Sequence, residues 1–223
     1  MKKYLIVLIL VMLCLVGCGK KDGKINSDSP LAKAKSQMMS NLKNYNYDVT
    51  MVTESSFMDI ETTMNCTDDL ANKLTYCSTS TFGVEQESYY DYNKKVSYTK
   101  TTSVYGYGSQ DWTKTKLNNN TNTWLDLSDY VYDLKSESRN GGTYYTGVID
   151  GKKLAASLSQ TDSNANYDSI VGSDINIEIF VNSKNYIETL NFDMEIMGMK
   201  ETVKVKFKDY NSAGSVKLPS SLK

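Results

Sequence analysis

Side chains that commonly carry catalysis are scarce in this chain of 223 residues, which contains four cysteines and no histidine. Histidine is the commonest general base and a common metal ligand, so its absence excludes Ser-His and Cys-His catalysis and the usual zinc sites. The sequence also lacks a G-x-S-x-G motif, a phosphate-binding glycine loop and any cluster at metal-ligand spacing. A carboxylate pair for sugar hydrolysis stays open, because Asp and Glu are numerous. We predict a protein that is not an enzyme and uses no cofactor.

Two of the cysteines, Cys66 and Cys77, flank the turn-rich segment TDDLANKLTY. A hairpin folded about the centre of this segment places the two positions opposite each other on neighbouring strands. A disulfide can persist there if the protein lies outside the cytoplasm, and closing so short a loop stabilises the fold by on the order of 3 kcal/mol in the chain-entropy model. A catalytic or metal-binding pair is the alternative, but no other thiolate partner lies nearby. We predict the disulfide.

The other two cysteines, Cys14 and Cys18, lie near the N-terminus. Two lysines precede an uncharged run, Tyr4 to Val16, that is shorter than the roughly 20 apolar residues needed to span a bilayer. Such a start with a small-residue junction is typical of a secretory signal peptide. The junction Leu15-Val16-Gly17-Cys18 resembles the lipobox of bacterial lipoproteins, which implies cleavage before Cys18 and acylation of its thiol, for instance by palmitate. An ordinary secretory signal with an incidental cysteine is the alternative.

The expected organisation follows from this junction. Residues 1–17 form a lipoprotein signal peptide, residues 18–29 the lipidated cysteine and a flexible tether, and residues 30–223 one folded domain. The expected location is extracytoplasmic, in the cell envelope, with membrane lipid as a partner through the acyl anchor. The chain carries 25 Lys+Arg against 26 Asp+Glu, so no basic excess is available for phosphates and nucleic acid is excluded as a partner. Nothing in the sequence identifies a protein partner.

Alternation of apolar and polar residues predicts β-strands over most of the domain. The clearest are 175–181, 186–196 and 203–207, which are joined by tight turns and each present one apolar and one polar face. They are expected to form an antiparallel meander. Further strands are predicted at 45–51, 58–66, 74–82, 88–92, 95–101, 111–117 and 144–150.

Helices are predicted at 30–44, 125–135 and 152–159. The first has Ser29 as its N-cap and Pro30 in its first turn. A sheet with one apolar face must cover that face with something, and these amphipathic helices are the available cover.

Three aspartates, Asp126, Asp129 and Asp133, share one side of the second predicted helix. Clustered carboxylates are able to bind calcium, but a solvated helical face is the preferred interpretation, so no metal is predicted.

Three stretches of the sequence carry a family resemblance: YYTGVIDGKKLAASL (144–158), INIEIFVNSKNYIETLNFDMEI (175–196) and VKVKFKDYNSAGSVKLP (203–219). They are similar to a strand-turn-helix unit, paired strands and the last strand of LppX/LprG-type lipoproteins, in the LolA-like lipoprotein-carrier superfamily. The family often has Trp-Ile-Asp where this chain has Phe180-Val181-Asn182. The resemblance implies an α+β, β-rich fold, a curved antiparallel sheet or half-barrel with a few helices on its concave face and a lipid cavity between them.

The leading hypothesis is therefore a non-enzymatic binder or carrier of lipid or another hydrophobic ligand. Methionines adapt their shape and suit promiscuous apolar surfaces, although they also fill closed cores. The predicted cavity-lining residues, whose faces are inferred from alternation alone, are Met38, Leu42, Met51, Met58, Ile60, Ile177, Ile179, Leu190, Phe192, Met194, Val205 and Phe207.

The alternative hypothesis is a surface lipoprotein with a closed core that contacts a protein or glycan partner. It draws on the 17 tyrosines of the chain and predicts a contiguous exposed aromatic area. The candidate tyrosines are Tyr89, Tyr90, Tyr92, Tyr98, Tyr105 and Tyr107.

Overall fold

The computed structural model describes residues 29–54, 58–103, 111–117, 123–153, 173–196 and 199–222. The predicted signal peptide, Cys18 and all of the tether except Ser29 lie outside this part, and so do residues 154–159 of the third predicted helix. Among the residues that the structure describes, every helix is too short or too polar to traverse a lipid bilayer.

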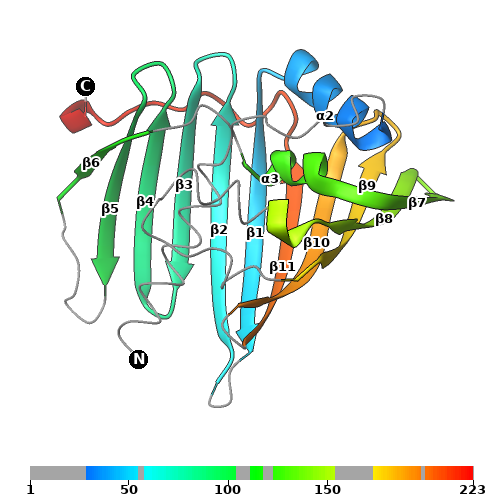
Figure 1. Cartoon of the computed structure of the whole chain (residues 1–223). Coiled ribbons are helices and arrows are strands. Elements are labelled where there is room, and N and C mark those ends of the chain that lie inside the picture. The colour runs from blue at the N-terminus through cyan, green and yellow to red at the C-terminus, as the bar shows by residue number, and fades with distance from the viewer. Residues whose placement is uncertain are drawn as a thin grey trace.

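A single sheet of 11 strands dominates the molecule, in the order β6-β5-β4-β3-β2-β1-β11-β10-β9-β8-β7. Every pairing is antiparallel. Figure 1 shows a curved, open sheet with β6 and β7 at its two edges. This confirms the predicted fold class. The strands are β1 (Asn44–Glu54), β2 (Ile60–Asp69), β3 (Leu74–Thr81), β4 (Val84–Asp91), β5 (Val96–Ser103), β6 (Thr113–Lys116), β7 (Val131–Arg139), β8 (Gly142–Ile149), β9 (Ile175–Asn182), β10 (Ile187–Ile196) and β11 (Met199–Lys208).

Strict alternation of burial gives the sheet one inner face. On β1 the buried side chains include Tyr45, Tyr47, Val49 and Met51, and the residues between them are only half-buried. β9 and β11 show the same alternation, and the predicted C-terminal meander of β9, β10 and β11 is confirmed. Because successive side chains of a strand point to opposite faces, the buried set defines what we call the inner face.

Apart from the short C-terminal 3₁₀ turn, the described helices lie together on the inner face (Figure 1). α2 (Pro30–Asn41) begins as predicted, with the Ser29 hydroxyl accepting a hydrogen bond from the Ala32 N–H at 3.1 Å. It ends before the predicted residue 44, because Leu42 is already extended and β1 begins at Asn44. α3 (Thr123–Asp126) continues into the 3₁₀ turn η1 (Leu127–Tyr130).

The second predicted helix, 125–135, is wrong beyond Tyr130. Val131 begins β7, which pairs with β8, so tertiary pairing overrides the helical spacing. The two strands approach closely at Gly147, where a Cβ would lie 2.5 Å from Val131 Cγ1 and 3.0 Å from the Tyr132 carbonyl oxygen. The Val131 side chain and the Tyr132 backbone thus pack against a strand that has no side chain at this point.

The segment after β11 forms hydrogen bonds with the N-terminal strands. The Asn211 N–H donates to the Asn44 carbonyl oxygen at 2.8 Å, and the Val216 N–H donates to Asp69 Oδ2 at 3.1 Å. Figure 1 shows this segment running along one end of the strands to η3 (Ser220–Leu222). The C-terminal residues therefore brace the start of β1 and the end of β2.

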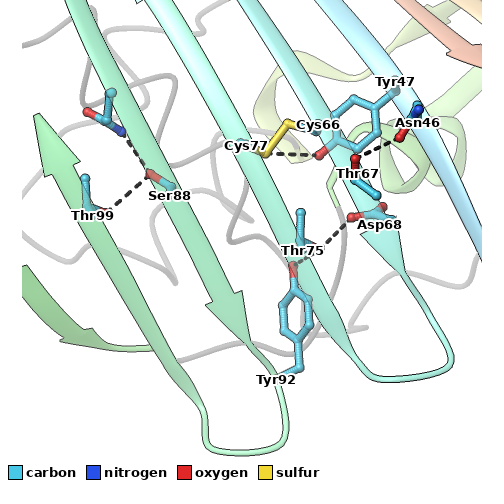
Figure 2. The surroundings of a disulfide bond; sticks show 11 residues. Asn46, Tyr47, Cys66, Thr67, Asp68, Thr75, Cys77, Ser88, Tyr92 and Thr99 are labelled. Carbon is cyan, nitrogen blue, oxygen red and sulfur yellow. Dashed lines mark hydrogen bonds between the residues drawn. A yellow bond between two sulfur atoms is a disulfide. The ribbon is translucent and has the colours of Figure 1, made fainter. Parts of the chain in front are cut away.

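The predicted disulfide is confirmed. Cys66 on β2 and Cys77 on β3 lie directly opposite each other in the antiparallel register and are bonded. Both are buried, and the Tyr47 hydroxyl lies 3.8 Å from Cys77 Sγ (Figure 2). The disulfide therefore links two neighbouring strands covalently within the core.

Replacing both cysteines by alanine (C66A/C77A) is expected to lower the free energy of unfolding by about 3 kcal/mol, because the unfolded chain regains the freedom of a short loop. Urea denaturation measures the change, with Asn65→Ala, at an exposed position of β2, as control. Alkylation without reductant should add no mass at the two cysteines. A double variant as stable as the control would contradict the stabilising role.

Candidate functional site

The predicted cavity residues gather at one place. All of them except Met58 and Ile60 belong to the buried core cluster, to which they contribute from α2 and its C-cap, β1 and β9–β11. Ile60 is partly buried against this cluster, whereas Met58 is 48% exposed and lies at the surface. Met58 precedes β2, so strand alternation does not govern its orientation. That the buried members line a ligand cavity stays a prediction.

Apart from Glu201, the half of the inner face on β9, β10 and β11 is apolar. Val205 pairs with Leu190, which pairs with Ile179, and these three buried side chains form one row across the strands. Val203, Phe192 and Ile177 form the next row. From the helix layer, Met38 accepts a 3.2 Å hydrogen bond at its Sδ from the Ile187 N–H. This half offers the continuous aliphatic surface that buries acyl chains.

The other half of the inner face, on β2 to β5, carries hydroxyls instead. The register of these strands places the following side chains on the same face as Cys66 and Cys77: Thr62, Thr75, Thr79, Thr81, Ser88, Ser97, Thr99 and Thr101. Several bond to each other. The Thr62 hydroxyl donates to Thr81 at 2.8 Å, and the hydroxyls of Ser88 and Thr99 lie 3.4 Å apart (Figure 2). The inner face therefore changes from apolar to hydroxyl-lined across β1.

A buried carboxyl anchors the hydroxyl-lined half. Asp68 is 1% exposed and accepts a hydrogen bond from the Thr75 hydroxyl (Figure 2). Burial raises the pKa of Asp68 to about 6, although hydrogen bonds from Thr75 and Tyr45 act in the opposite direction. Because its polar partners surround it, Asp68 is best explained as part of the structural network.

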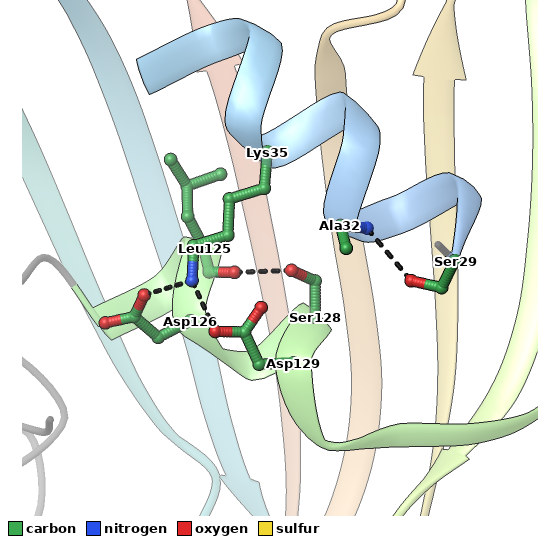
Figure 3. A network of polar contacts seen from close by, with 7 residues as sticks. All are labelled: Ser29, Ala32, Lys35, Leu125, Asp126, Ser128 and Asp129. Carbon is green, nitrogen blue, oxygen red and sulfur yellow. Dashed lines mark hydrogen bonds and ion pairs between the residues drawn. The ribbon is translucent and has the colours of Figure 1, made fainter. Parts of the chain in front are cut away.

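An ion-pair network, which we call the clamp, joins α2 to the segment formed by α3 and η1. The Lys35 ammonium on α2 pairs with Asp126 and, at 2.6 Å, with Asp129 (Figure 3). Burial lowers the pKa of Lys35, but the two carboxylates outweigh that effect and the net pKa is raised. The third aspartate of the predicted cluster, Asp133, lies on β7 and is exposed. The carboxylates at 126 and 129 therefore hold a lysine, which differs from both the solvated face and the calcium site considered from the sequence.

A second buried carboxyl, Glu201 on β11, lies on the inner face and was missed from the sequence. It is 2% exposed, and within the described part of the chain its Oε2 has no hydrogen-bond partner. Burial raises the pKa of Glu201 to about 7. Its position in phase with Val203, Val205 and Phe207 was a usable signal, because residues two apart on a strand share a face.

The tyrosines of the alternative hypothesis do not form one exposed surface among the described residues. Tyr90 and Tyr98 are buried, at 6% and 7% exposure, and Tyr89 and Tyr92 are half-buried. Tyr90 faces inward, whereas Tyr89 lies on the outer face against Tyr76 and Trp112, with ring centroids 4.8 Å and 5.5 Å away. Tyr105 and Tyr107 lie outside the described residues.

No family model and no curated protein matches the chain. Solved structures with a similar fold include the lipoprotein LppX of Mycobacterium tuberculosis, with 10% identity, coverage of 84% of this chain and 98% of that one, and a TM-score of 0.43. A LolA superfamily protein from Nitrosomonas europaea has 10% identity, coverage of 88% and 96%, and a TM-score of 0.34. A putative outer membrane lipoprotein-sorting protein domain from Vibrio parahaemolyticus has 6% identity, coverage of 86% and 93%, and a TM-score of 0.34. At these identities the likeness concerns the fold alone.

Lys35→Met is expected to lower the free energy of unfolding by about 2 kcal/mol, because it leaves two largely buried carboxylates without their cation. The matched control is Lys33→Met, an exposed lysine of the same helix. Adding Asp126→Asn and Asp129→Asn to Lys35→Met should restore part of the loss. Equal stability of the two single variants in urea denaturation would show that the clamp contributes nothing.

Glu201→Gln is expected to flatten the pH dependence of stability of the unliganded protein. Burial raises the pKa of Glu201 from 4.5 to about 7, so the native state binds more protons than the unfolded chain in this window and stability falls as pH rises through it. The shift corresponds to a decrease of about 3 kcal/mol in the free energy of unfolding, which is complete by pH 8. The variant should therefore be more stable than the unmodified protein at pH 8 and nearly equal at pH 4. Glu195→Gln, at an exposed position of β10, should leave the pH profile unchanged; parallel profiles for Glu201→Gln would refute the assignment.

Proposed function

We propose that this protein is a non-enzymatic, extracytoplasmic lipoprotein that is anchored through Cys18 and binds an amphiphilic lipid on the inner face of its sheet. The observation that supports the proposal is the division of one buried face into an apolar half and a hydroxyl-lined half. A face of this kind matches a molecule with an acyl chain at one end and hydrogen-bonding groups at the other.

The free energies of burying apolar surface and hydroxyl groups support a bound ligand on this face. Burying an acyl chain contributes about 25 cal/mol per Å² of apolar area, and the rows on β9 to β11 supply that area. Burying hydroxyls costs free energy unless they are paired, and several of those on β2 to β5 pair with each other in this structure. Such hydroxyls can exchange these bonds for hydrogen bonds to a ligand. They are useful where a polar part of a ligand must be received.

A second candidate function is contact with a glycan or protein partner on the outer face. Tyr76, Tyr89 and Trp112 form a half-buried aromatic cluster there, and the Tyr76 hydroxyl donates to Glu87 at 3.1 Å. Aromatic rings beside a carboxylate suit sugar recognition, since the rings stack on the apolar face of a sugar and the carboxylate accepts its hydroxyls.

The test is native mass spectrometry of the mature chain, secreted from a bacterial host with Cys18→Ser so that no acyl anchor is attached. We expect a bound mass that matches a lipid and is released by organic solvent. An apoprotein mass alone, together with no binding of added dodecanoyl lysophospholipid, would overturn the lipid proposal and favour the outer-face function.

A matched pair of variants locates the ligand. Ile177→Phe enlarges a buried inner-face side chain, and Glu178→Gln changes its exposed outward neighbour on β9. Lipid occupancy should fall several-fold in the first and stay constant in the second. If Ile177→Phe lowers stability without changing occupancy, the ligand does not lie on this face.

A further inference from the structure

Two buried polar groups on the apolar half lack partners. Glu201 Oε2 and the Trp124 indole Nε1, on residues 2% and 0% exposed, make no hydrogen bond within the described residues. A buried donor or acceptor without a partner costs about 1–3 kcal/mol. Native proteins rarely keep such groups unless a ligand or a water molecule pairs with them.

The two residues lie along the same stretch of β10. Glu201 lies opposite Met194 on β10 and opposite Thr53 on β1. The Trp124 ring, on α3, lies 6.5 Å from the ring of Phe192, which precedes Met194 by two residues on the same face. A carboxyl and two aromatic rings therefore border one stretch of the inner face, at the end of the apolar rows.

Within the described chain, no cation of the protein faces Glu201. Its inner-face neighbours on β1, β10 and β11 are Thr53, Met194 and Val203. Lys200, beside it on β11, points to the outer face and pairs with Glu54 and Asp193. Lys35, the cation nearest to α3 in the helix layer, is held by the clamp.

Resting on the proposed function, we infer that Glu201 and Trp124 bind the charged group of the ligand's head beside β1, where the apolar half meets the hydroxyl-lined half. This group is an ammonium accompanied by a hydrogen-bond acceptor. The ammonium donates to the Glu201 carboxylate and supplies the counter-charge that the inner face lacks. Trp124 and Phe192 offer aromatic faces to the same cation. The Trp124 N–H donates to an oxygen of the head, such as a phosphate or ester oxygen.

The ionisation behaviour of the carboxyl agrees with this chemistry. Burial raises the pKa of Glu201 to about 7 in the free protein, and a bound ammonium favours the charged form and lowers that pKa. Binding of an ammonium lipid should therefore strengthen between pH 6 and pH 8.

Isothermal titration calorimetry below the micelle concentration tests the inference on the mature Cys18→Ser chain, delipidated in its folded state. The probes are dodecanoyl lysophosphatidylethanolamine and dodecanoyl lysophosphatidylglycerol, which share chain and phosphate and differ in the ammonium. At pH 8 we expect about tenfold tighter binding of the ethanolamine lipid, the range of one charge-assisted hydrogen bond. Glu201→Gln should remove this preference, and Glu195→Gln should keep it.

Trp124→Phe keeps an aromatic ring and removes the N–H, so it should weaken both lipids alike, by about fivefold. Thermal unfolding of each variant confirms that it is folded. If the unmodified protein binds both lipids equally, or if Glu201→Gln retains the preference, the head-group assignment is overturned while the proposed function stands. If neither lipid binds, the head-group assignment is also overturned, and the proposed function fails with it when native mass spectrometry finds no bound lipid.

Discussion

The pairing of β1 with β11 is the contact on which the rest of the structure depends. It joins residues 46–54 to residues 200–208 in a continuous antiparallel register, and so converts two separate sheets into one. Tyr45, Tyr47 and Phe207 stack across this seam with ring centroids 5.8–6.2 Å apart. Pairing β1 with β11 closes a long loop, which costs conformational entropy. The aromatic cluster and the Asn211 hydrogen bond to Asn44 lie at this seam and offset part of that cost.

The seam also separates two kinds of buried surface. On the β9 to β11 side the buried surface consists of rows of apolar side chains. On the β2 to β5 side it contains hydroxyls, several of which form hydrogen bonds with each other. The two buried carboxyls differ in the same way. Asp68 sits among donors that lower its pKa, while Glu201 has burial as the cause of its raised pKa and nothing to offset it. A buried carboxyl whose charged form has no stabilising partner in the fold is a candidate for contact with a ligand.

Much of this architecture was predictable from alternation, because a half-buried strand must repeat every two residues. The meander and the residues of the inner face follow from that rule, and the turn-rich segment between Cys66 and Cys77 predicted the disulfide. The rule failed where a short helix and a strand share one apolar period: Val131 and Leu134 fit a helix as well as β7, and only the partner strand β8 decides between them. Glu201 was missed because a charged residue at the start of a strand is usually assigned to solvent.

The two edge strands are built in a way that lets the sheet stay open without pairing with another chain. A closed barrel would remove both edges, whereas this sheet ends at β6 and β7. β6 is short and carries Lys114 and Lys116, and β7 is interrupted by an irregularity between Tyr132 and Lys135, where Asp133 adopts a positive φ of 50°. Short, charged or bulged edges resist pairing with another chain. The protein can therefore keep an open half-barrel, in which the helix layer held by Lys35 covers one part of the inner face.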